Sequence, residues 1–146
     1  MRGHQYVTCA FEAWKEADRE ILMHIRGTSM LPLIKPADRV LIRPLDPHHL
    51  NRGDIFAFWM NGSVVVHRYI RKKKVEGSYW YCQKGDHLSG WSWVPENRVI
   101  GRVESIQGKT RMVRLSHRPW PWLNSLLGCL IEGWIRLREK YTQRGH

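Results

Sequence analysis

The sequence predicts a mainly β domain with a helix at each end, and three observations support this fold class. Between residues 39 and 115, short runs rich in β-branched and aromatic residues follow one another. The prolines of that region lie between these runs, where they interrupt no strand. Near both ends of the chain, apolar residues recur at helical spacing instead. The length of 146 residues suffices for one domain with a real core.

The N-terminal helix is expected over residues 9–20, where Phe11, Trp14 and Ala17 are spaced three residues apart. An extended segment follows over 21–27. Asn61-Gly62 separates two β-rich runs and predicts a hairpin. The strands are expected over residues 39–43, 54–60, 64–71, 79–84, 98–106 and 110–115.

A boundary is expected in the segment "SHRPWPW", which divides the chain into a β domain over 1–118 and a helical extension over 119–146. The extension contains an amphipathic helix over 123–141. Its apolar face consists of Leu123, Leu126, Leu127, Leu130, Ile131, Trp134 and Ile135. Such a helix either docks on the β core, which is the commoner outcome, or lies in a membrane interface. Peripheral membrane contact through 120–141 is therefore one expectation.

The net charge of +11 favours an anionic partner, either nucleic acid or an anionic membrane surface. The basic run 71–74 reads as a solvated hairpin tip, without a recognition helix or aromatic–basic motif beside it. We therefore expect no nucleic-acid partner. The histidines at 48, 49, 87 and 117 lack the spacing of metal ligands, so neither a metal nor another cofactor is expected.

The three cysteines, Cys9, Cys82 and Cys129, are odd in number and widely spaced, which argues against a disulfide framework and favours a reducing compartment. The N-terminus has no apolar run of the signal-peptide type, and no segment offers about 20 uninterrupted apolar residues. The expected location is the cytoplasm, with membrane association left open. The oligomeric state is left open as well.

Four short motifs occur in order along the chain. They are "GTSMLP" at 27–32, "DRVLI" at 38–42, "RGDI" at 52–55 with "VHRYI" at 66–70, and "KGD" at 84–86 with "NRVIGRV" at 97–103. Each motif is weak alone, but in this order they resemble the type I signal peptidases and the LexA-type self-cleaving repressors of the same serine-peptidase clan. The resemblance covers about residues 25–103 and implies a coiled β-sheet core.

The resemblance also implies site residues. The serine of the "SM" turn is the nucleophile in that clan, which assigns the role to Ser29. His67 stands where bacterial signal peptidases and LexA place a lysine base, as in the Ser–His signal peptidases of the endoplasmic reticulum, archaea and sporulation. Asp86 matches the aspartate of the "KGD" box and would complete a triad, unless it only caps a turn.

These residue types suit acyl transfer. A serine hydroxyl needs a base, and a neutral histidine serves near pH 7. A carboxylate would hold the histidine tautomer, and the Ser29 N–H would stabilise the oxyanion. Many signal peptidases place a serine where this chain has Gly27, so Thr28 is the other candidate donor. No second aspartate follows the "GD" box, and Glu96 is the only acid nearby.

We therefore expect a serine endopeptidase that cleaves a peptide or protein precursor, for example by removing a leader. The substrate should bind extended beside the turn formed by Gly27, Thr28, Met30, Leu31 and Pro32, with residues 55–58 as a second wall and small side chains preferred. Two alternatives remain. A self-cleaving LexA-like regulator would need a DNA-binding domain, for which the residues before Gly27 are too few. A non-catalytic β module would bind peptides by strand addition.

Overall fold

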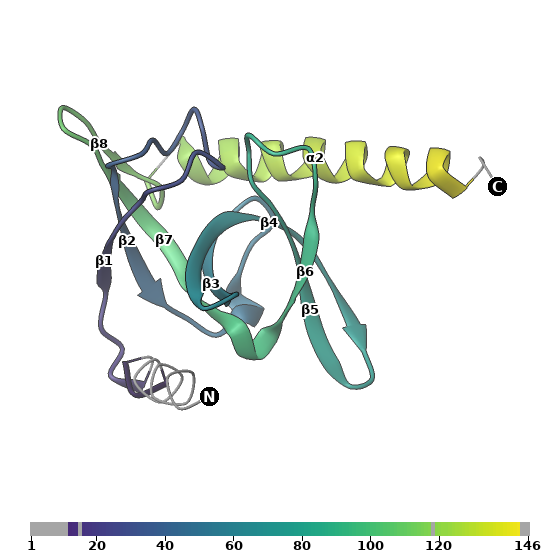
Figure 1. Ribbon diagram of the computed structural model, residues 1–146, viewed down its shortest axis with the longest axis horizontal. Coiled ribbons are helices and arrows are strands. Elements are labelled where there is room, and N and C mark those ends of the chain that lie inside the picture. Colours follow the sequence, from purple (N-terminus) through teal and green to yellow (C-terminus); the bar gives the residue numbers. More distant parts are fainter. Residues whose placement is uncertain (1–11, 15, 118, 144–146) are drawn as a thin grey trace.

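One curled antiparallel sheet forms the centre of the computed structural model, which describes residues 12–14, 16–117 and 119–143 (Figure 1). Its strands are β1 (Ile21–His24), β2 (Arg39–Pro44), β3 (Ile55–Met60), β4 (Ser63–Val75), β5 (Ser78–Lys84), β6 (Ser92–Pro95), β7 (Val99–Gln107) and β8 (Met112–Arg114). The strand order is β1-β2-β7-β3-β4-β5-β6, with β8 beside β7. Short 3-10 turns occur at Pro47–His49 and Glu96–Arg98. The predicted mainly β fold is confirmed.

The elements differ from expectation mainly at their ends. Of the helix predicted over 9–20, residues 12–14 and 16 are helical and residues 17–20 are not. Residues 9–11 and 15 lie outside the described residues. β4 continues to Val75 because β5 pairs with it as far as Val75 opposite Ser78. The run 71–74 is therefore strand, not hairpin tip, although Lys72, Lys73 and Lys74 are exposed. The short strand β6 was not predicted, since "SWVP" contains a proline and only four residues.

The sheet packs apolar side chains on both faces. One cluster consists of Met30, Ile34, Val40, Ile42, Ile55, Ala57, Val66, Ile100, Val103, Ile106 and Leu115. The other consists of Leu50, Phe56, Phe58, Tyr69, Tyr81, Val94 and Val99. Since side chains alternate along a strand, β4 contributes Val66 to the first cluster and Tyr69 to the second. His67 and Arg68 are adjacent in β4 and point to opposite faces.

Helix α2 (Trp120–Gln143) passes along the sheet, and its C-terminal end reaches beyond the strands (Figure 1). Its buried residues are Asn124, Gly128, Glu132 and Ile135. A Cβ at Gly128 would lie 2.7 Å from the backbone nitrogen of Gly53, so this contact requires a glycine. Arg52 fixes the helix further through a 2.8 Å ion pair with Glu132.

The helix thus docks on the β core, but with only part of the predicted apolar face. Of that face, Ile131 and Ile135 pack onto Ile70 and Cys82, whereas Leu126, Leu127 and Leu130 are exposed. The physical reason is that small and polar residues of α2 contact the segment before β3: Gly128 packs against Gly53, and Glu132 forms an ion pair with Arg52. The pattern of apolar residues in the sequence does not predict contacts made by small and polar side chains.

Candidate active site

Ser29 lies in a tight turn between β1 and β2. The turn is closed by hydrogen bonds from the Leu31 N–H to Thr28 O (3.1 Å) and from the Ile34 N–H to Met30 O (2.9 Å). Met30 and Ile34 are buried in the core and anchor the turn there. These bonds leave the Ser29 N–H without an acceptor among the described residues, so it is available to a ligand.

The backbone that follows β5, at Gly85 and His87, contacts the Ser29 turn. The His87 N–H donates to Ser29 O at 2.9 Å. A Cβ at Gly85 would lie 2.7 Å from the same oxygen, so only glycine permits this close approach. The glycine of the motif therefore has a structural task at the nucleophile candidate.

Asp86 forms an ion pair with Arg68, the neighbour of His67 in β4. Its two oxygens accept from Arg68 Nε at 2.8 Å and Nη2 at 2.6 Å. Arg68 is buried, and its Nη1 also donates to Gly53 O (2.7 Å) and Asn124 Oδ1 (2.9 Å). No hydrogen bond joins Asp86 to His67 within the described chain. Asp86 therefore links the loop behind Ser29 to β4 and influences His67 only through its field.

His67 is held by an amide. Its Nδ1 lies 2.5 Å from Gln83 Oε1, and Gln83 Nε2 donates to Ser92 Oγ at 2.5 Å. An amide oxygen only accepts, so His67 Nδ1 carries the proton and Nε2 keeps a free lone pair. That tautomer is the one a general base requires.

Sequence reasoning missed Gln83, because the resemblance directed attention to carboxylates. The available signal was its place two residues before Gly85, on a strand expected to follow β4.

The environment keeps His67 neutral. The side chain is buried, and this desolvation lowers the pKa of His67 below its ordinary value of 6.5. The Gln83 hydrogen bond and the negative charge of Asp86 oppose the shift, whereas the positive charge of Lys84 adds to it. At pH 7 the imidazole is therefore ready to accept a proton. Between Ser29 and His67 themselves, no hydrogen bond is present in the described chain.

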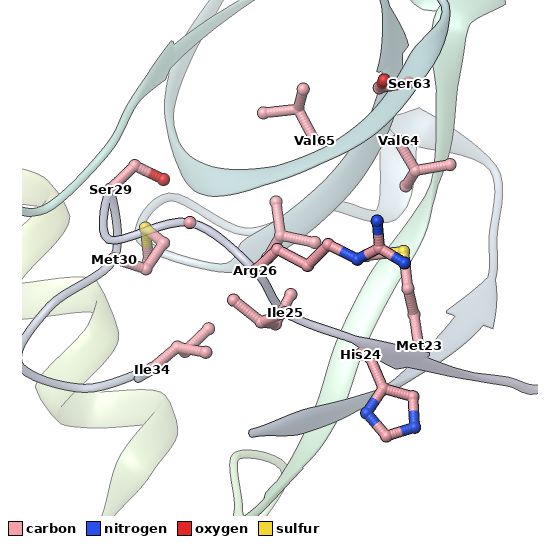
Figure 2. A pocket seen from close by; sticks show the side chains of 12 residues that line it. Met23, His24, Ile25, Arg26, Ser29, Met30, Ile34, Ser63, Val64 and Val65 are labelled. Carbon is pink, nitrogen blue, oxygen red and sulfur yellow. The ribbon is translucent and has the colours of Figure 1, made fainter. Parts of the chain in front are cut away.

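A hollow of about 320 Å³ lies between the segment leading to Ser29 and the start of β4 (Figure 2). It is lined by residues 23–27, Ser29, Met30, Ile34 and residues 63–66. Figure 2 shows the two lining segments running in the same direction, with Ser29 at one end. Val66, the neighbour of His67, also lines it. Of the predicted substrate contacts, Gly27 and Met30 line the hollow, whereas Thr28, Leu31, Pro32 and residues 55–58 do not.

The two walls of this hollow are open sheet edges. β1 is the last strand in the sheet order. β4 pairs with β5 only from Arg68 onward, so the outer edge of 63–67 has no strand partner in the described chain. An extended peptide would fit here as an additional strand.

Other candidate groups lie elsewhere. Glu96 accepts from the Tyr79 N–H at 3.4 Å and lies 3.9 Å from His48, away from His67. Burial raises the pKa of the Cys82 thiol to about 11, and Cys82 and Cys129 are both free; Cys9 lies outside the described residues. The described part of the chain contains no cluster of three metal-ligating side chains.

Comparison with protein families finds a match to the model of the family described as Peptidase S24-like, over residues 2–80. The match spans more than half of the chain and includes Ser29 and His67. It ends before Gln83 and Asp86. No curated protein matches the chain.

Proposed function

The chain belongs to the Peptidase S24-like family, and we propose that it is a serine endopeptidase with Ser29 as nucleophile and His67 as general base. One observation carries this proposal: the Gln83 oxygen holds Nδ1 of a buried, neutral His67, which leaves Nε2 free to take a proton. The serine turn is fastened to the strand of this histidine through Gly85 and the Asp86–Arg68 pair. Serine–base pairs are often longer before substrate binds, so the missing direct hydrogen bond is compatible with this role.

The proposed reaction begins with attack of Ser29 Oγ on the scissile carbonyl carbon, while His67 Nε2 takes the hydroxyl proton. The carbonyl electrons move onto oxygen, and the Ser29 N–H stabilises that oxyanion. Collapse breaks the C–N bond, and His67 donates the proton to the leaving amine. Water then attacks the Ser29 ester with His67 again as base, which releases the acid product and restores the serine.

In this scheme Gln83 orients the imidazole without a charge. A carboxylate in its place would stabilise the imidazolium more strongly, but it would also raise the pKa of His67. With the uncharged amide as partner, burial keeps the base neutral to lower pH than it would be beside a carboxylate. Asp86 supplies a negative field at a distance, with its charge largely matched by Arg68.

The proposed substrate is an extended peptide, such as a leader or other precursor segment. It would occupy the hollow between the segment before Ser29 and the start of β4, where its backbone can pair with an open strand edge. The apolar side chains of Met23, Ile25, Val64 and Val65 line this hollow, so small apolar side chains should be preferred near the cut.

The experiment is exposure of the full chain to a library of unstructured peptides, with products identified by mass spectrometry. The expected result is cleavage at one pattern of small apolar residues, absent with S29A and H67A, both of which should remain folded at the assay temperature. Cleavage that persists in S29A would overturn the proposal. Cleavage only of the chain itself would favour the self-cleaving regulator, and binding without cleavage would favour the peptide-binding module.

A further inference from the structure

Helix α2 has two sides with different surroundings. The side carrying Gly128, Glu132 and Ile135 is buried against the sheet and the segment before β3. The opposite side carries large apolar residues, most of them three or four apart, and all of them are exposed, from 41% for Leu127 to 68% for Tyr141. We call this side the outer stripe. It consists of Trp122, Leu126, Leu127, Leu130, Trp134, Leu137 and Tyr141.

The charges around the outer stripe are of one sign. Arg136, Arg138 and Lys140 alternate with the stripe residues in the C-terminal half of the helix, and all three are exposed. The two acids of the helix are both neutralised on its docked side. Glu132 pairs with Arg52 and Arg136, and Glu139 pairs with Arg71. The surface around the stripe is therefore apolar and cationic.

Aromatic rings occur along the stripe, from Trp122 near its start to Tyr141 near its end. Such rings, with an apolar body and a polar tip, prefer the headgroup level of a bilayer. The Arg138 guanidinium lies over the Trp134 ring at 5.2 Å, so an exposed cation and an aromatic ring lie side by side on this surface. No helix in the described chain is long and apolar enough to span a membrane. Amphipathic helices with such a cationic border lie in the plane of a membrane interface.

From this arrangement we infer that the outer stripe of α2 binds the surface of an anionic phospholipid bilayer and holds the protein there as a peripheral membrane protein. A second copy fits less well, because two stripes brought together would also bring together their cations in a chain of net charge +11. An acidic lipid surface complements both the apolar and the cationic part of the stripe. The inference does not rest on the proposed peptidase activity.

The test is flotation of the full chain with vesicles of phosphatidylcholine alone and with vesicles that also contain phosphatidylglycerol. The parent should float with the anionic vesicles, more weakly with the neutral ones, and less as salt increases. L130Q should weaken the binding roughly tenfold or more, because a leucine is no longer buried. The matched control M112Q changes an exposed apolar residue of β8 and should leave binding unchanged.

The charge contribution is tested by K140E against K109E. Both lysines are exposed, but Lys109 lies in the turn before β8, away from α2. K140E should weaken binding to anionic vesicles roughly tenfold or more, and K109E much less. Binding that is absent, or equal for the parent, L130Q and K140E, would overturn the inference. A parent protein that binds no vesicles but forms a dimer in sedimentation experiments, with the dimer lost in L130Q, would also overturn the inference. None of these readouts depends on peptide cleavage.

Discussion

His67 and Arg68 are neighbours in β4, but their side chains lie on opposite faces and have partners of different charge. On the Arg68 face, a buried cation is matched by the Asp86 carboxylate and by two neutral oxygens. On the His67 face, the imidazole packs against the Phe58 ring, and its hydrogen-bond partner is the amide of Gln83, which in turn donates to the Ser92 hydroxyl. Asp86, the carboxylate that the family resemblance suggested as the partner of His67, therefore pairs with Arg68 and stabilises the fold. The difference predicts that changes on the Arg68 face act chiefly on stability, whereas changes on the His67 face act chiefly on the rate.

The largest expected effect is on the His67 face. H67A should lower kcat/KM by about 10³-fold or more, because the serine loses its base. The free energy of unfolding should also fall by about 1–3 kcal/mol, because the buried His67 ring packs against Phe58 and its loss leaves Gln83 Oε1 without its partner. H49A, an exposed histidine outside the site, is the matched control. Unchanged turnover in a folded H67A protein would remove the histidine from the mechanism.

On the Arg68 face, the expected effect is on stability. D86A leaves the buried guanidinium without its carboxylate and should lower the free energy of unfolding by about 3–5 kcal/mol. E20A removes the partner of Arg43 in an exposed ion pair and should cost less than about 1 kcal/mol. Denaturant titration of both variants measures the contrast. Equal losses of unfolding free energy in D86A and E20A would mean that the buried Arg68–Asp86 pair stabilises the fold no more than an exposed ion pair does.

Gln83 provides the complementary case. Q83L leaves the buried Nδ1–H unpaired when the ring is oriented for catalysis, at about 1–3 kcal/mol, so kcat/KM should fall roughly tenfold to hundredfold. S92A removes only the second bond of the chain and should have a smaller effect. Steady-state kinetics on one cleavable peptide measures both. A Q83L variant as active as the parent would show that the amide does not orient His67.

The smallest expected effect concerns the oxyanion. A Cβ at Gly27 meets no atom within 4 Å, so G27S should fold normally and bring a hydroxyl near the Ser29 turn. If this hydroxyl supplies a second donor, kcat/KM should rise by a few-fold, roughly two- to tenfold. G27A adds the same Cβ without the hydroxyl and should give no rise. An equal rise in both variants would assign the effect to the backbone.

Much of the fold could be predicted from the sequence, because each β-rich run has the local pattern of a strand and Asn61-Gly62 marks one hairpin. The order of the motifs likewise pointed to Ser29 and His67. The partner of His67 could not be read in this way. Which residue of β5 faces it depends on the register with β4, and an irregularity between Tyr69 and Arg71 shifts that register. Tertiary contacts of Gly53 and Arg68 likewise decide which side of α2 is buried.

The central claim is that a neutral amide, rather than a carboxylate, holds Nδ1 of His67, the proposed general base, while burial keeps its imidazole neutral. It is tested most directly by kcat/KM against pH for the parent and for Q83E on one peptide. Because burial lowers the pKa of His67, the parent's activity should rise with pH through a midpoint below 6.5 and then stay constant. In Q83E the new carboxylate would stabilise the imidazolium, so the midpoint should move to higher pH. A parent midpoint above 6.5, or the same midpoint in both proteins, would contradict the account.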